Sequence, residues 1–172
     1  MSLGKPLLND EPGASVRTFV GLLVALLVVG GFPVLWTGHV ADAHDLAAPL
    51  GASATLMALT PNHPFAAAKA VVLGNLVAAV IGLSAAALVH VPLLAAAVAL
   101  AMSVVALRLL GITHPPASGM AVMAALGGVG SLEGAAGFLL VNVLISAVVL
   151  TVVMLLVNRV SEGRVGGGDH LA

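Results

Sequence analysis

Residues 113–119 read Thr-His-Pro-Pro-Ala-Ser-Gly and interrupt the apolar sequence in the second half of this 172-residue chain. Each of the two prolines lacks a backbone N–H, and the residue before a proline avoids the helical region of backbone space. We therefore expect the helix that arrives from Arg108 to end near Thr113 and a new helix to begin at Ser118, whose hydroxyl suits an N-cap. Two interpretations are open at this point: a tight loop between two membrane helices, or a broken helix that lines a solute path.

The composition of the chain decides its class. Hydrophobic residues make up 60% of the sequence and charged residues 8%, and the mean hydropathy is +1.18. Soluble domains carry about 25% charged residues, so this chain has too little polar surface to face water. Several apolar runs reach the roughly 18 residues that indicate a membrane-spanning helix, and the period-two alternation of a membrane barrel is absent. We therefore predict an all-α membrane protein.

The apolar runs divide the chain into six membrane elements. Four are long helices, expected at about residues 18–36, 66–89, 93–112 and 135–157, and two are short or broken helices, expected at 47–60 and 118–127. The first of these is short because about 15 residues at 1.5 Å each do not cross a hydrocarbon core of about 30 Å. The membrane domain then covers residues 17–158, between polar tails at 1–16 and 159–172 that we expect to be disordered.

The six Lys and Arg residues predict the orientation, because cations gather on the cytoplasmic side of membrane proteins. With six crossings and a cytoplasmic N-terminus, every cation falls inside, whereas with four crossings Lys69 and Arg108 would fall outside. We therefore expect both termini in the cytoplasm and the chain in the inner (plasma) membrane of a bacterium. The cations are Lys5, Arg17, Lys69, Arg108, Arg159 and Arg164.

Groups suited to catalysis or metal binding are scarce. Glu133 is the only carboxylate between Asp45 and Glu162, so the membrane region offers no acid–base pair. Without a cysteine, a phosphate-binding loop or a basic patch, we expect no enzyme activity, no cofactor and no nucleic acid partner. The connector at 37–45 carries two His and two Asp that could ligate zinc, but a solvated acidic loop is the better interpretation and we predict no metal site. These four residues are His39, Asp42, His44 and Asp45.

The six elements divide into two halves, each in the order long, short, long. Since each half crosses the membrane an odd number of times, a duplication would produce two inverted repeats. Short matches favour this: Ala52-Ser53 corresponds to Ala117-Ser118, and Leu73-Gly74-Asn75 corresponds to Leu140-Val141-Asn142. Such matches also arise by chance in alanine-rich sequence, so the repeat is a hypothesis.

The starts of the two short elements form the expected binding site. A helix that begins inside the membrane presents unpaired N–H donors and about half a positive charge, which attract an anion. Non-helical backbone at membrane depth is tolerated only where it is buried in protein or lines a cavity, which favours a path between the two segments. The small and hydroxyl-bearing residues that would let an anion approach are Gly51, Ala52, Ser53, Ala117, Ser118 and Gly119.

Three blocks of the sequence resemble the HPP family of small integral membrane proteins. They are residues 49–56 (PLGASATL), residues 67–83 (AAKAVVLGNLVAAVIGL) and the motif His114-Pro115-Pro116-Ala117, in the family's order and spacing. Family members are implicated in nitrite transport, so the resemblance implies an anion transporter or channel. The chain departs from the family pattern where Ala67 and Ala68 replace glutamine and proline, Lys69 replaces arginine and Asn75 replaces histidine. These departures concern the substrate more than the fold.

We predict a membrane transporter or channel for a small monovalent anion, with nitrite as the first candidate and a homo-oligomer in the lipid bilayer as its form. The alternatives are a channel for water or a small neutral solute, and an assembly subunit that transports nothing. His114 would gate the path or relay a proton, or else bond a free carbonyl at a helix end. Asn75 and Asn142 would bind the anion or join helices. Attraction or gating of anions, or simple anchoring at the interface, is expected of Lys69, Arg108 and His63.

Overall fold

The structure, a computed structural model, describes residues 12–37, 40–127 and 131–162. Those residues form helices joined by short turns, with no strand among them, so the predicted all-α membrane class is confirmed. The α-helices are α1 (Pro12–Thr37), α2 (Val40–Leu59), α3 (Ala68–Leu88), α4 (Pro92–Leu109), α5 (Ala117–Gly127), α6 (Leu132–Gly137) and α7 (Ser146–Glu162). A 3₁₀ turn, η2 (Pro64–Ala66), precedes α3, and a π-helical segment, η3 (Phe138–Ile145), joins α6 to α7.

Three helical stretches in the described part of the chain are long and apolar enough to cross a membrane: Ala68–Leu88, Pro92–Leu109 and Glu133–Arg159. Shorter apolar stretches lie at Thr18–Gly31, Ala47–Leu59 and Ala117–Gly127. Helix α5 has 11 residues, or about 16 Å at 1.5 Å per residue, which is half of a hydrocarbon core. It therefore needs the extended segment before it to complete a crossing.

Several predicted boundaries are corrected by the structure. Helix α1 begins at Pro12 and α7 ends at Glu162, so residues 12–16 and 159–162 are helical and not part of the tails. Helix α2 has 20 residues and begins at Val40, so most of the expected connector at 37–45 belongs to its first turns. Its apolar part, Ala47–Leu59, is short, as predicted. Pro49 lies inside α2, because packed membrane helices tolerate the one backbone hydrogen bond that a proline removes. Residue His39 and the side chains of 40–46 lie outside the described part.

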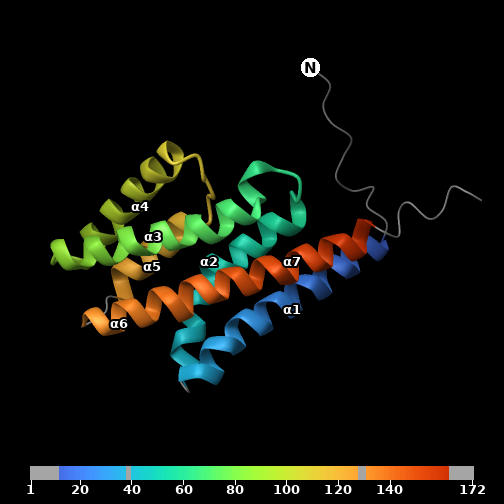
Figure 1. Cartoon of the computed structure of the whole chain (residues 1–172), viewed down its shortest axis with the longest axis horizontal. Coiled ribbons are helices and arrows are strands. Elements are labelled where there is room, and N and C mark those ends of the chain that lie inside the picture. Colours follow the sequence, from blue (N-terminus) through green and yellow to red (C-terminus); the bar gives the residue numbers. More distant parts are fainter. Residues whose placement is uncertain (1–11, 38–39, 128–130, 163–172) are drawn as a thin grey trace, which may run out of the picture.

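Successive membrane elements reverse direction along the long axis of the molecule (Figure 1). The start of α1 and the end of α7 consequently lie side by side, and α1 packs along α7. Lys69 is the second residue of α3, while Arg108 and Arg159 stand in the last turns of α4 and α7. Lys69 and Arg159 therefore stand toward the end of the bundle that holds the start of α1, opposite α6, whereas α4 ends above α3 in Figure 1, away from the ends of α1 and α7.

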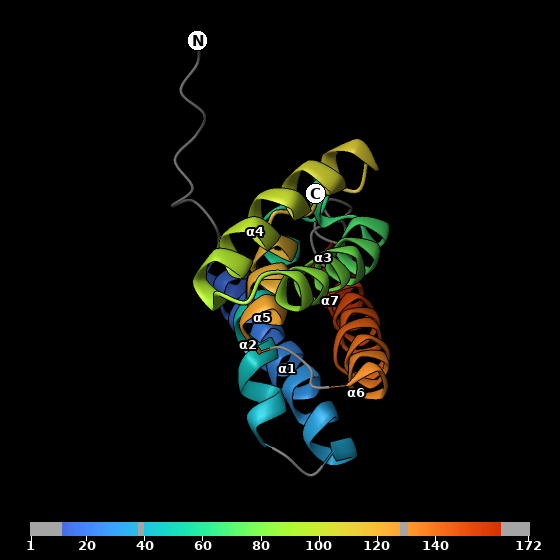
Figure 2. The same ribbon diagram turned by 90° about the vertical axis from the view of Figure 1, so that its left-hand side faces the viewer.

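Helix α5 occupies the middle of the bundle, where it packs against α2, α3 and α4 (Figure 2). The segment that leads into it begins where α4 ends at Leu109, three residues earlier than predicted. Gly111 has a φ of 65°, and two backbone hydrogen bonds close the helix end, from Ile112 N to Leu107 O (3.1 Å) and from Gly111 N to Arg108 O (3.2 Å). This is a Schellman motif, which favours glycine because the left-handed conformation crowds a β-carbon. The chain then runs in non-helical form through His114, Pro115 and Pro116 to α5.

Helices α3 and α5 approach each other closely through glycine and alanine. A β-carbon on Gly82 would collide with the carbonyl of Ala121 and the side chain of Ala124, and one on Gly74 would lie 3.1 Å from the β-carbon of His114. Small residues are the usual means by which membrane helices gain packing, since lipid tails compete for every apolar contact. The position of α5 therefore depends on the small side chains of α3.

The variant Gly82→Ala should lower the free energy of unfolding in detergent by about 1–3 kcal/mol, because the added methyl group forces two helix backbones apart. The matched control is Gly31→Ala in α1, where an added β-carbon meets no atom within 4 Å and helix propensity improves. Thermal or SDS-induced unfolding followed by circular dichroism measures both. Equal stability of the two variants would contradict the close α3–α5 contact.

Candidate functional site

The His114 imidazole joins three segments that are far apart in the sequence. Its Nδ1 lies 2.7 Å from the carbonyl oxygen of Phe65 in η2, and its Nε2 lies 2.8 Å from the hydroxyl oxygen of Ser53 in α2. A carbonyl oxygen only accepts hydrogen bonds, so Nδ1 carries a hydrogen and donates it to Phe65. The side chain is fully buried, and this bridge therefore ties the entrance of α5 to both α2 and η2.

The backbone of Phe65 is held on both sides by histidine. Its carbonyl accepts the hydrogen bond from His114, and its N–H donates to Nδ1 of His63 at 3.2 Å. The His63 and Phe65 rings also meet edge to face, with their centroids 4.5 Å apart. His63 is exposed, so it stabilises the turn that presents the Phe65 carbonyl and does not itself reach the interior.

Ser53 is fully buried and contacts two acceptors. Besides Nε2 of His114, its hydroxyl lies 2.9 Å from the carbonyl oxygen of Pro49, one helical turn earlier. A hydroxyl has a single hydrogen, which it can give to one of the two at a time. The hydroxyl therefore serves as the meeting point between the imidazole and the proline-containing turn of α2.

His114 lies in the non-helical connector at 110–116, which leads into the short apolar helix α5. Among the described residues, its ring bonds to a backbone carbonyl and to a hydroxyl.

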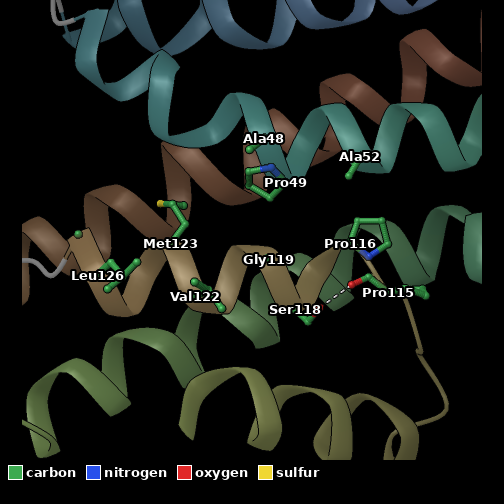
Figure 3. A pocket seen from close by; sticks show the side chains of 11 residues that line it. Ala48, Pro49, Ala52, Pro115, Pro116, Ser118, Gly119, Val122, Met123 and Leu126 are labelled. Carbon is green, nitrogen blue, oxygen red and sulfur yellow. Dashed lines mark hydrogen bonds between the residues drawn. The ribbon is translucent and has the colours of Figure 1, made fainter. Parts of the chain in front are cut away.

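A cleft of about 790 Å³ separates α2 from α5 (Figure 3). Pro49 and Ala52 form the α2 wall, while Pro115, Pro116 and the first two turns of α5 form the other. Ser53 follows Ala52 and His114 precedes Pro115, so the bonded pair is adjacent in sequence to residues of both cleft walls, although neither of the two lines the cleft itself. The lining is mostly small and apolar: Ala48, Pro49, Ala52, Pro115, Pro116, Ser118, Gly119, Val122, Met123, Leu126 and Gly127.

The expected anion site, built on free N–H donors at two helix starts, is wrong in its geometry. The first N–H groups of α5 are already used: Ala117, Ser118 and Gly119 donate to the carbonyls of residues 114, 115 and 116 at 2.9, 3.2 and 3.0 Å. Ser118 does not cap the helix, because it stands inside the first turn and its hydroxyl donates to the Pro115 carbonyl at 2.7 Å. Gly51 and Ser53 stand in the interior of α2, where no helix begins.

The structure brings together some of the predicted residues and separates others. Ala52, Ser118 and Gly119 line the cleft, and Ser53 and His114 bond to each other without lining it. Gly51 instead faces Leu26 of α1, since a β-carbon there would lie 3.9 Å from that side chain. Two further predicted residues do not line the cleft: Ala117 is fully buried, and Asn142 is half-buried in η3.

Asn75 is fully buried on α3 with half of its amide satisfied. Its Nδ2 donates to the carbonyl of Val71 at 2.8 Å, while its Oδ1 has no hydrogen-bond partner among the described residues. A buried acceptor without a donor costs about 1–3 kcal/mol. The interior of the bundle thus contains an acceptor suited to a group that brings its own hydrogen.

The two cations expected to attract or gate anions, or to anchor at the interface, do not reach the cleft. Lys69 and Arg108 are exposed and do not line the cleft, which contains no charged residue. Among the described residues, no three His, Asp or Glu side chains come close enough to hold a metal ion. The chemistry available in the described interior is therefore hydrogen bonding through carbonyls, hydroxyls, an amide and one imidazole.

Sequence reasoning missed the partners that are backbone atoms. The carbonyls of Phe65 and Pro49 complete the hydrogen bonds of His114 and Ser53, and Asn158 Nδ2 donates to the carbonyl of Met57 at 3.1 Å, which joins α7 to α2. No residue type signals such an acceptor. Pro49 could have pointed to the α2 wall, because a proline inside an apolar run marks a place where the backbone hydrogen bonding of a membrane helix is interrupted.

The chain matches the family model described as HPP, transmembrane region, over residues 9–166. The chain belongs to the HPP family. The match includes all three blocks on which the resemblance was based, and it agrees with an HPP membrane domain that contains the His114 bridge and the cleft. None of the curated proteins and none of the solved structures compared with this HPP protein matches it.

A double-mutant cycle on Ser53→Ala and His114→Ala should show a coupling free energy of about 0.5–2 kcal/mol, because each single variant already breaks the hydrogen bond that joins them. The free energy of unfolding in detergent is measured for the native chain, both single variants and the double variant. Strictly additive losses would mean that the two side chains do not interact in the folded protein.

Proposed function

We propose that this HPP protein carries a small weak acid across the membrane through the cleft between α2 and α5, with nitrite as the first candidate. The observation that carries the proposal is a cleft with small residues on both walls, adjacent in sequence to the buried His114–Ser53 pair. Its volume is ample for a triatomic ion with several waters. The resemblance to family members implicated in nitrite transport supports the substrate.

The polarity of the interior supports a solute that crosses together with a proton. An anion buried in an apolar setting needs a counter-charge or hydrogen-bond donors. The described cleft lining contains no cation, and the backbone donors at the start of α5 are already bonded. A proton can supply the missing charge, either on the solute as nitrous acid or on an imidazole beside it.

A small neutral solute, including water, is the second candidate. The unpaired Oδ1 of Asn75 favours it, because this atom accepts hydrogen bonds and repels a bare anion. Transport of a neutral solute would not depend on the membrane potential, which distinguishes it from movement of an anion alone.

The packing of the helices supports two inverted repeats. In two such repeats, α1 would correspond to α4, α2 to α5, and α7 to α3. Helices α1, α2 and α7 all contact one another, and so do their counterparts α4, α5 and α3. The α2–α5 pair maps onto itself, so the cleft lies where a pseudo-two-fold axis would pass. Sites at the interface of inverted repeats are usual for membrane transporters.

Both termini are proposed to face the cytoplasm of a bacterial cell. The reversal of direction from element to element and the placement of Lys69 and Arg159 toward the end that holds the start of α1 support this orientation. The exposed cations would concentrate anions there. Many large apolar side chains are exposed on α1 and α4, which leaves room for lipid or for a second copy in a homo-oligomer.

Purified protein in liposomes should take up nitrite faster than empty vesicles do, and Ala52→Leu should slow this uptake by roughly tenfold or more, which corresponds to ~1.4 kcal/mol in the barrier. The larger side chain fills the cleft beside Pro49. The matched control is Ala97→Leu, an equal enlargement at an exposed position of α4 that does not line the cleft.

Nitrate, formate, chloride and urea are tested in the same vesicles, with and without a potassium–valinomycin clamp of the membrane potential. Uptake of nitrite that accelerates as external pH falls supports transport with a proton. No flux of any solute above that of empty vesicles would overturn the proposal.

Single cysteines report the orientation without interference, because the chain has no native cysteine. We expect a membrane-impermeant maleimide to label Ser131→Cys from outside intact spheroplasts and to label Asn62→Cys only in inverted vesicles. Both positions are exposed, at opposite ends of the bundle. Labelling of both from the same side would contradict an arrangement in which these ends face opposite sides of the membrane.

A further inference from the structure

We propose that His114 is a reversible proton-binding site whose two states are exchanged by rotation of the Ser53 hydroxyl, with no movement of heavy atoms. The role of this proton in transport rests on the proposed function. The binding of the proton itself is a separate property of the folded chain and is tested without any solute.

The bridge through His114 has fewer hydrogens than hydrogen-bond contacts. Three short contacts lie in series: Phe65 O to His114 Nδ1 at 2.7 Å, His114 Nε2 to Ser53 Oγ at 2.8 Å, and Ser53 Oγ to Pro49 O at 2.9 Å. A neutral imidazole with its hydrogen on Nδ1 supplies one hydrogen and the hydroxyl supplies another. Two hydrogens therefore serve three contacts, and the third contact is completed when one proton is added.

Each protonation state has a complete set of bonds in this geometry. When His114 is neutral, the Ser53 hydroxyl points at Nε2 and donates to it. When His114 is protonated, Nε2–H donates to the Ser53 oxygen, and the hydroxyl turns to donate to the Pro49 carbonyl. Both ring nitrogens and the Ser53 hydroxyl have a partner in each state, and two carbonyl dipoles reduce the usual penalty for protonating a buried imidazole.

No described carboxylate stands ready to neutralise the protonated ring. The elements that contact His114 are α2 through Ser53, η2 through Phe65 and α3 through Gly74, and the ring lies just before α5. The charged or titratable side chains described on these elements are His63, whose Nδ1 is engaged by Phe65 N, and Lys69, which is exposed. Arg108, before the connector, is exposed as well. Helix α2 also carries Asp42, His44 and Asp45 in its first turns, about two turns or more before Ser53, and their side chains lie outside the described part. The cleft on the far side of Pro49 and Pro115 is therefore where a counter-charge would enter, on the transported anion.

The proton on His114 and an anion in the cleft then strengthen each other's binding. An anion in the cleft stabilises the imidazolium, and by thermodynamic reciprocity the imidazolium raises affinity for the anion by the same factor. With an empty cleft the site loses its proton as the pH rises and gains it as the pH falls. A low pH on one side of the membrane would favour binding of the proton and the anion together. The transported unit would then be an anion with its proton.

The test is ¹⁵N NMR of the histidine rings in the full chain in detergent micelles, with His114→Gln to assign the His114 signals. We expect the neutral ring to carry its hydrogen on Nδ1 and to titrate in a single step while the protein stays folded. Ser53→Ala should move the midpoint down by about one pH unit, since the charged form loses a stronger hydrogen bond than the neutral form does. Ser53→Thr, which keeps a hydroxyl, should stay near the native midpoint.

The proposal is overturned by a native ring that does not titrate while the protein stays folded, by a neutral ring protonated on Nε2, or by an unchanged midpoint in folded Ser53→Ala. The native titration alone decides the first two outcomes if Ser53→Ala does not fold. Titration without flux in liposomes would overturn the proposed function and leave the proton site standing. Flux without titration would do the reverse.

Discussion

The entrance of α5 is fixed by one buried imidazole that bonds to residues 61 and 49 positions away in the sequence. Without His114, the non-helical segment before α5 would have no polar attachment to α2 or η2 among the contacts found. Individual hydrogen bonds between membrane helices are worth about 0.6 kcal/mol on average, so the bridge is a modest source of stability. Its larger effect is geometric, because it fixes where the two prolines after His114 stand and hence the width of the cleft.

The remaining contacts of α5 are made by small residues. Alanine and glycine on α3 let the two backbones approach, and lipid tails leave little hydrophobic advantage to larger side chains at such an interface. The position of α5 is therefore determined by close packing of small side chains and by a few hydrogen bonds. The unpaired Oδ1 of Asn75 on α3 is the clearest departure, and it marks a place where a donor from outside the chain is expected.

Much of the architecture was predictable from the sequence. The composition established the membrane class, and the His-Pro-Pro segment predicted the break before α5 because proline chemistry is local. Ser53 and His114 were selected as candidates separately, but their bond was not, since it depends on how α2 crosses α5. The same limit explains the error at α2: residues 51–53 were expected at a helix start, whereas the helix begins at Val40 and continues through Pro49. The backbone N–H groups of Ala117, Ser118 and Gly119 are already hydrogen-bonded because the chain turns tightly at the start of α5. The residue types alone do not predict this turn.

The most direct test of the cleft as the solute path uses Ala52→Cys in a chain that has no other cysteine. Flux of nitrite into liposomes is measured before and after reaction with a methanethiosulfonate reagent, and again after a reductant removes the adduct, with Ala97→Cys as the control. The account predicts that flux falls on modification of residue 52, recovers on reduction and is unaffected at residue 97. Undiminished flux through protein that mass spectrometry shows to be fully modified at residue 52 would contradict it.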